Sequence, residues 1–207
     1  MTFFPEKQGY NLEEFHKEYS KRLSLALSQI DPKSLDEVYS SLLKCVKTGS
    51  TIFTCGNGGS SSIAEHLVCD FVKGASTNSD IQPKVFPLLS TPILTAIAND
   101  ISYDEVFSFQ LAKYSQKNDI LLSVSSSGNS ENIVKAIEKA KSLGLLTISF
   151  IGFDGGRAKE ISDLVIHVAV ENYGIAEDAH HALMHIFAQY LRLQSVTEKE
   201  KIGKIKF

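Results

Sequence analysis

Five short runs of apolar residues, separated by segments with helical spacing, set the strongest limit on how this chain can fold. The runs are continuous and do not alternate with polar residues, which is typical of strands in a parallel sheet covered on both faces. Strand and helix alternate, so each strand can lead through a helix to a parallel neighbour. The pattern predicts an α/β fold, a three-layer sandwich with a five-stranded parallel sheet flanked by helices. The predicted strands are 51–55, 84–88, 120–124, 146–151 and 164–168, and the predicted helices between and after them are 61–73, 92–99, 104–116, 130–143 and 176–194.

Two more segments with apolar residues at helical spacing come before the first strand, and they predict an N-terminal helical hairpin. They cover residues 11–30 and about 33–48, with Asp31 and Pro32 between them. The hairpin has more apolar surface than one face of a sheet is expected to need, so we expect it to support oligomerisation. The predicted organisation is an arm and hairpin at 1–50, an α/β domain at 51–195 and a charged tail at 196–207.

Composition excludes several classes of protein. The 207 residues are 43% hydrophobic and 22% charged, which is typical of a globular chain and not of a disordered or fibrous one. A net charge of −3 without a basic block argues against a nucleic-acid partner. No run approaches the roughly 18 apolar residues of a membrane span. The first ten residues lack the pattern of a secretory signal, and three cysteines without metal-finger spacing suggest a reduced, cytoplasmic protein.

Two of the predicted strands end in loops of small and polar residues, and ligands of parallel sheets bind at the carboxyl ends of strands. Residues 125–130 read Ser-Ser-Ser-Gly-Asn-Ser and precede a helix, so hydroxyls and backbone N–H groups can converge on an anion. Residues 56–60 have the same character one strand earlier. No lysine lies close by and the spacing is not that of a nucleotide loop, which favours a sugar phosphate. The alternative is a flexible serine loop with a helix cap at Asn129 or Ser130.

Two helices carry imidazoles and carboxylates on one face. His66 and Asp70 are four residues apart, and Glu177, His181 and His185 follow one another at the same spacing in the last helix. Such groups are costly to bury unless they are paired or ligated, and they suit a divalent metal ion or acid–base catalysis. The alternative is an ordinary helix surface in the first case, and a polar helix start with one core histidine in the second.

Five separated segments carry a resemblance: CGNGGSSSIAEH at 55–66, AIAND at 96–100, SVSSSGNSENIVKAI at 123–137, GFDGG at 152–156 and the helix around His185. In this order they resemble the sugar isomerase (SIS) domain family, and within it the phosphoheptose isomerases. The resemblance implies a five-stranded parallel sheet with an N-terminal hairpin used in a homotetramer. It also implies an aldose–ketose isomerase that converts sedoheptulose 7-phosphate to a heptose 7-phosphate for cell-surface heptose biosynthesis, by proton transfer through an enediolate.

The resemblance further implies roles for individual residues. One set would line the sugar: Asn57, Gly58, Gly59, Asn99 and Asp100. A second set would hold the phosphate: Ser60, Ser125, Ser126, Ser127 and Ser130. A third would bind one Zn²⁺ per subunit: His66, Asp70, Glu177 and His185. Asp70 and His185 would also act as catalytic base and acid, in either order, and Glu177 would also contact the substrate.

The chain departs from the family pattern at the sugar end of the expected pocket. Asp70 stands where the family has a glutamate, and Glu177 stands where it has a glutamine. Lys73 and Gly74 replace an arginine and a tyrosine, and residues 174–176 replace a stretch with an aspartate and an arginine. The resemblance therefore indicates a sugar phosphate more specifically than a heptose.

Two other functions fit the same family. Some non-catalytic SIS proteins bind the replication initiator and have lost the catalytic histidine of the last helix, whereas this chain keeps His185 and a carboxylate at Asp70. Sugar-phosphate sensing domains are usually attached to a DNA-binding module, which this chain lacks. An isomerase for a different ketose phosphate is a further alternative. We therefore expect a sugar phosphate and identical subunits as partners.

Overall fold

A computed structural model of the chain describes residues 3–204; the ends of the predicted arm and tail, residues 1–2 and 205–207, lie outside the described residues. Its centre is one five-stranded sheet with the order β2-β1-β3-β4-β5, in which every neighbouring pair is parallel. The predicted α/β fold with a five-stranded parallel sheet is therefore confirmed. The strands are β1 Thr51–Gly56, β2 Lys84–Pro87, β3 Ile120–Ser125, β4 Leu146–Ile151 and β5 Leu164–His167.

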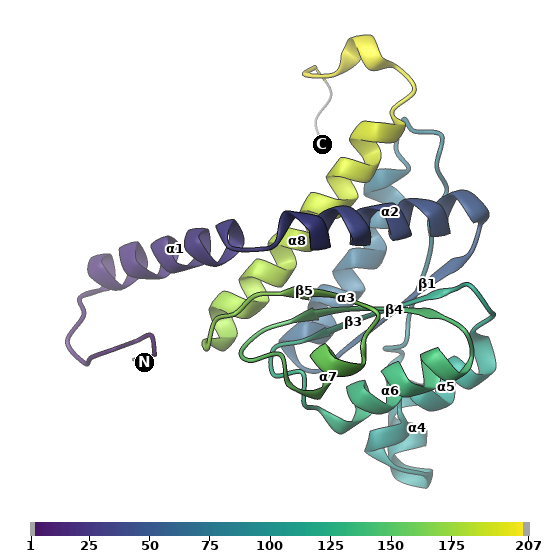
Figure 1. Cartoon of the computed structure of the whole chain (residues 1–207), viewed down its shortest axis with the longest axis horizontal. Helices are drawn as coiled ribbons and strands as arrows, with labels where there is room; N and C mark the ends of the chain where they lie inside the picture. The colour runs from purple at the N-terminus through teal and green to yellow at the C-terminus, as the bar shows by residue number, and fades with distance from the viewer. Residues whose placement is uncertain (1–2, 205–207) are drawn as a thin grey trace.

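Helices cover both faces of the sheet, and each layer encloses its own hydrophobic cluster. Figure 1 shows the two helical layers on opposite sides of the strands. The helices of the first layer are α1 Leu12–Ser28, α2 Pro32–Thr48, α3 Gly59–Cys69 and α8 Tyr173–Ser195. Those of the second are α4 Thr91–Asp100, α5 Ser108–Tyr114, α6 Glu131–Ser142 and α7 Gly156–Ile161.

The predicted N-terminal hairpin is not formed, because α1 and α2 follow each other end to end instead of packing side by side (Figure 1). Short helices account for the other differences from the predicted elements. The predicted helix 61–73 starts as α3 but widens into a π-helix, η1 (Asp70–Ala75), at a carboxylate of the expected site. The predicted helix 104–116 is divided into a 3₁₀ turn, η2 (Tyr103–Glu105), and α5. Helix α7 was not predicted, because six residues after a glycine pair are too few for a clear apolar period. A last 3₁₀ turn, η3, spans Lys199–Lys201.

Local sequence sets the helix boundaries. Asn11 and Glu14 form a capping box at the start of α1, and Asp31 caps α2 just before its Pro32. Helix α8 begins at Asn172, whose side chain accepts a hydrogen bond from the backbone N–H of Ile175. These caps hold α1, α2 and α8 in the layer that carries most of the expected site.

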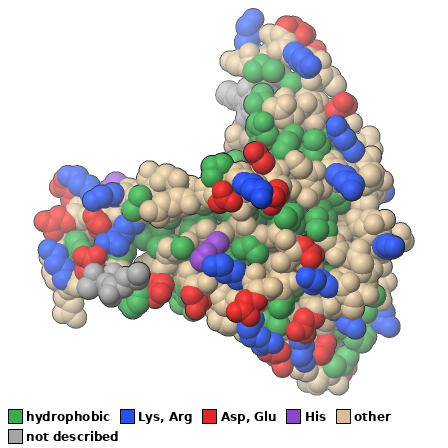
Figure 2. All heavy atoms as spheres, in the orientation of Figure 1, with side chains coloured by type: hydrophobic (Ala, Val, Ile, Leu, Met, Phe, Trp, Pro, Cys, Tyr) green, Lys and Arg blue, Asp and Glu red, His purple; other side chains and the backbone are tan. Residues whose placement is uncertain are grey.

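Two parts of the molecule project from its body, α1 with the N-terminal arm and the C-terminal half of α8 (Figures 1 and 2). The arm is anchored by Phe4, which is buried and packs against the rings of Phe15 and Tyr19. Figure 2 shows charged side chains of both signs on the α1 projection. Within the described residues, no helix combines the length and the apolar character needed to span a membrane.

Candidate active site

A small cavity opens where strands β1 and β3 end. The two strands are neighbours, with Gly56 opposite Val124, so the loops that follow them lie side by side at the carboxyl edge of the sheet. The cavity has a volume of about 130 Å³. We call it the serine cavity. It is lined by Asn57, Ser60, Val124, Ser125, Ser126, Ser127, Ser130, Tyr173 and Glu177.

The loop at 125–130 is folded so that several hydrogen-bond donors are free to face a ligand. The Ser125 hydroxyl accepts from the backbone N–H of Gly128 at 3.1 Å and can still donate its own proton. Ser130 stands at the N-cap of α6 without making a side-chain capping bond. The Ser126 hydroxyl is buried and has no hydrogen-bond partner among the described residues. A buried hydroxyl without a partner, in a loop that leads into a helix N-terminus, leaves hydrogen-bonding capacity for a ligand.

Asn57 is held by two residues that the sequence analysis did not single out. Its side-chain amide makes a reciprocal pair with that of Asn132 on α6, at 2.8 and 2.9 Å, and its oxygen also accepts from the Tyr103 hydroxyl at 3.0 Å. The oxygen therefore has both acceptor positions filled, and one N–H of the amide is left for a ligand. Asn132 is buried in the first turn of α6, where an amide gives no periodic signal in the sequence.

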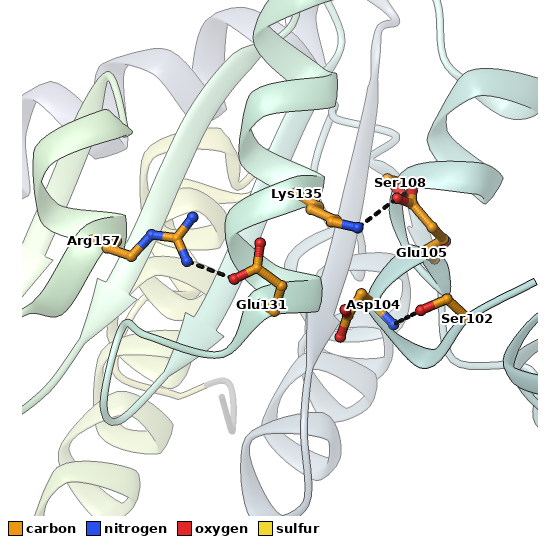
Figure 3. A network of polar contacts seen from close by, with 7 residues as sticks. All are labelled: Ser102, Asp104, Glu105, Ser108, Glu131, Lys135 and Arg157. Carbon is orange, nitrogen blue, oxygen red and sulfur yellow. Dashed lines mark hydrogen bonds and ion pairs between the residues drawn. The ribbon is translucent and has the colours of Figure 1, made fainter.

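Polar contacts between helices keep Tyr103 in this position. Figure 3 shows Glu105 of η2 paired with Lys135 of α6, at 2.8 Å, and hydrogen-bonded to Ser108. Farther along, Glu131 at the start of α6 pairs with Arg157 of α7 (Figure 3). These contacts fix η2 and Tyr103 against α6. We call the segment 125–130, which leads into α6, the serine loop.

Glu177 belongs to the serine cavity through its place in the second turn of α8. A Cβ added to Gly59 would lie only 2.2 Å from Glu177 Oε2, so the carboxylate rests against the first residue of α3. A larger residue at position 59 would force this carboxylate to move. Burial, and secondarily the negative charge of Asp178, raise the pKa of the Glu177 carboxyl. Gly58 adopts a positive φ of 55° at the same turn.

A second cluster lies farther along the contact between α3 and α8. His185 Nδ1 donates to Asp70 Oδ2 at 2.6 Å, and His66 Nε2 is 3.4 Å from Asp70 Oδ1. On the other side of its ring, His66 Nδ1 is 2.7 Å from His181 Nε2. Three of the four residues expected to bind zinc therefore meet here, and the fourth, Glu177, faces the serine cavity.

The imidazoles of this cluster could hold a metal ion. His66, His181 and His185 each offer a ligand atom, and these atoms lie within 4.8 Å of one another. Burial and the two neighbouring imidazoles lower the pKa of His181, which favours the neutral form that binds metals. The sequence analysis placed His181 on the same stripe as His185 but gave it no ligand role.

Asn99 and Asp100 lie outside both groups. They are exposed at the end of α4, where the Asn99 amide donates to the Asp100 carboxylate at 2.7 Å. Neither lines the serine cavity. Tyr173, which does line it, is contributed by the first residue of α8 and packs edge-on against Phe153.

Fold and site together define an α/β protein with a serine-lined cavity at the carboxyl edge of a parallel sheet and, farther along α3 and α8, a carboxylate–imidazole cluster of the kind used in acid–base chemistry or metal binding. The chain belongs to the SIS domain family, since the family model described as SIS domain matches residues 14–152.

Named relatives match most of the chain. A phosphoheptose isomerase of Clostridium acetobutylicum is 33% identical over 172 residues, which cover 83% of this chain and 85% of that protein. A phosphoheptose isomerase of Helicobacter pylori strain P12 is 35% identical over 171 residues, covering 83% and 87%.

Solved structures show the same fold. The structure of a phosphoheptose isomerase from Francisella tularensis aligns with a TM-score of 0.82 at 22% identity, over 89% of this chain and 99% of that chain. The phosphoheptose isomerase of Neisseria gonorrhoeae aligns with a TM-score of 0.78 at 27% identity, over 85% and 94%.

Proposed function

We propose that this protein is an aldose–ketose isomerase of a sugar phosphate, with sedoheptulose 7-phosphate as its substrate and a heptose 7-phosphate for cell-surface heptose biosynthesis as its product. The observation that carries the proposal is the serine cavity, where the buried Ser126 hydroxyl has no partner among the described residues, in the loop that leads into α6. The relatives named phosphoheptose isomerase, which match 83% of the chain, support the same substrate.

The reaction moves a proton between the first two sugar carbons through an enediolate, which requires an acid and a base close together. Asp70 and His185 are joined by a 2.6 Å hydrogen bond and supply both groups in the protein without an ion. With an ion on the second nitrogen of His185, Asp70 alone could still exchange a proton with the sugar. The serine loop, with Ser60, binds the phosphate and contributes binding energy away from the reacting carbons. Asn57 offers its one remaining N–H to a sugar oxygen.

We propose that Zn²⁺ binds to His66, His181 and His185, which we call the histidine cluster. The donor set fits this ion, because imidazoles are ligands that zinc prefers and burial lowers the pKa of His181. A bound divalent ion supplies a Lewis acid that polarises a carbonyl oxygen. His66, His181 and His185 would hold it, and Asp70 would orient the His185 ring.

We further propose a homotetramer that assembles through the N-terminal segment 1–50, with 51–195 as the SIS domain and 196–207 as a charged tail. Apolar side chains exposed on the helices of the first layer, among them Leu25 and Ile186, support self-association. The cysteines are all unpaired, which supports a reducing compartment such as the cytoplasm.

An isomerase assay over a panel of ketose and aldose phosphates, with and without chelator, tests the proposal. We expect turnover of sedoheptulose 7-phosphate. The double variant Ser125→Ala/Ser130→Ala should raise KM by about tenfold or more, since a hydrogen bond to a charged group contributes roughly 1.5–3 kcal/mol.

Ser142→Ala is the matched control, because this hydroxyl lies at the other end of α6 and donates only to the Lys139 carbonyl. Circular dichroism would establish that all variants fold. Unchanged KM in the double variant would refute the phosphate assignment, and a panel without any turnover would refute the isomerase.

A further inference from the structure

The contacts of Asp70 distinguish the residues that bind an ion directly from a residue that only contacts them. We infer that the divalent ion is bound by three imidazoles, those of His66, His181 and His185, that Asp70 lies outside its coordination sphere, and that Glu177 takes no part in binding it. The inference rests on the proposed function only in placing a divalent ion at this cluster. It replaces the ligand set that the family resemblance implied.

Both carboxylate oxygens of Asp70 already contact an imidazole. Oδ2 accepts from His185 Nδ1 at 2.6 Å, and Oδ1 lies 3.4 Å from His66 Nε2. Metal-binding histidines commonly donate their second ring N–H to a carboxylate, which fixes the tautomer and the ring orientation. Here the carboxylate does this for the His185 ring, and it lies at ion-pair distance from His66 Nε2. The nitrogens left with a lone pair for a cation are then His66 Nδ1 and His185 Nε2.

His181 faces one of those two nitrogens. Its Nε2 lies 2.7 Å from His66 Nδ1, on the side of the His66 ring that does not face Asp70. Its ring stacks on that of His185, with centroids 5.2 Å apart and an angle of 15° between the planes. At this distance one ring donates its N–H to the lone pair of the other. A cation that displaces this shared proton, with a small separation of the rings, would be bound by both nitrogens.

Glu177 is too far along the helix pair to join them. Its carboxylate rests against Gly59, and Gly59 precedes His66 by seven residues within α3. Among the described residues, the ligand atoms that lie within 4.8 Å of one another come from the three imidazoles, and Glu177 is not in this group. The Glu177 carboxylate therefore belongs to the serine cavity. The ion then has no carboxylate ligand to neutralise its charge.

Cobalt titration tests this arrangement without reference to activity. Chelator-treated full-length protein would be titrated with Co²⁺ alone, and binding followed by its visible absorption and by elemental analysis. The variants are His181→Gln, Asp70→Asn and Glu177→Gln. The matched control is His16→Gln, which changes an exposed histidine on α1.

We expect one Co²⁺ per chain in the parent protein, in the control and in Glu177→Gln, with the same affinity. Asp70→Asn should weaken affinity by about 10–100-fold, as loss of an outer-sphere partner does, while the absorption spectrum keeps its shape. His181→Gln should weaken affinity more than Asp70→Asn and change the spectrum. Thermal melts monitored by circular dichroism would separate loss of binding from loss of folding.

The inference is overturned if Glu177→Gln weakens binding while His181→Gln binds Co²⁺ like the parent, or if Asp70→Asn changes the spectrum as a lost ligand does. Parent protein that binds no Co²⁺ also overturns it. Each of these results leaves the isomerase assay to decide the proposed function separately, because turnover of the sugar phosphate is measured independently of which residues bind the ion.

Discussion

Glu177 brings a carboxylate into a cavity whose other polar groups are neutral hydroxyls and an amide. A phosphate dianion bound there would be repelled by this charge. We expect Glu177→Gln to lower KM for the phosphorylated substrate severalfold at pH 8, where the carboxyl is ionised. Burial raises the pKa of Glu177, so the gap between parent and variant should narrow as the pH falls towards that pKa.

Steady-state kinetics between pH 5.5 and 8, within the range in which both proteins fold, would measure this gap. If the two proteins had the same KM, or if the difference in KM did not change with pH, the carboxylate and the phosphate would not share the cavity.

His180 allows a prediction on stability. It is fully buried beside Phe150, and burial lowers its pKa from 6.5 to about 4. The unfolded chain therefore binds a proton at a higher pH than the folded one. The stabilisation is complete above pH 6.5 and is lost as the pH falls from 6.5 to 4, by about 3 kcal/mol in all.

We expect His180→Leu to flatten the pH dependence of the free energy of unfolding over this range. Urea denaturation at several pH values, on parent and variant without metal, measures the difference in slope. Equal slopes would contradict the buried neutral imidazole.

The two residues 177 and 181 also mark the limit of sequence reasoning at this scale. The four-residue spacing predicted that Glu177, His181 and His185 share one face of a helix, and in α8 they do. The periodicity of one helix does not predict where a second helix packs against it. The position of α3 determines that His181 contacts His66 and that Glu177 contacts Gly59. Asn132 and Tyr103 escaped notice for the same reason, since their partner Asn57 is distant in sequence.

At the scale of elements, the first turn of α8 depends on a single cap. The Asn172 side chain accepts from the Ile175 N–H at 3.0 Å and donates to the Phe4 carbonyl at 3.0 Å, so it joins the helix to the N-terminal arm. We expect Asn172→Ala to lower the free energy of unfolding by about 1–2 kcal/mol, and to raise KM because Tyr173 and Glu177 lie in the first two turns.

Asn172→Asp is the control, since a carboxylate keeps the cap and suits the helix dipole while losing the donor to Phe4. Urea denaturation would compare the three proteins. If alanine were as stable as aspartate, the cap would not stabilise this helix.

Strands and helices were predicted well where burial on one face, or on both, gives the sequence a clear pattern of apolar residues, and less well where it does not. All five strands and the long helices agree with the structure to within a few residues. The π-helical turn at Asp70 was not foreseen, because its residues also fit an α-helical pattern; in the structure it packs against α8. The turn contains Asp70, so the geometry of the site differs there from the one that α-helical spacing suggests.

At the scale of the whole molecule, the projecting part of α8 presents an apolar surface. Ile186, Tyr190 and Leu193 are 51%, 45% and 38% exposed and line one shallow cavity. We expect the protein to be a homotetramer at micromolar concentration, as measured by light scattering. Ile186→Glu/Leu193→Glu should reduce the mass, because charges would then be buried between subunits.

Lys117→Glu, an exposed substitution in the loop before β3, is the control for added negative charge. A monomeric parent protein would contradict the tetramer, and a double variant with the parent's mass would place the interface elsewhere.

The matched contacts between α3 and α8 also restrict how this chain can change in length over evolutionary time. Gly59 meets Glu177 and His66 meets His181, so the two helices run in the same direction with a set register. Inserting one residue between Gly59 and His66 would turn His66 by about 100° away from its partners. Insertions and deletions are therefore tolerable in the surface loops, whereas the helical segments 59–66 and 177–185 must keep their length even where their residues are free to vary.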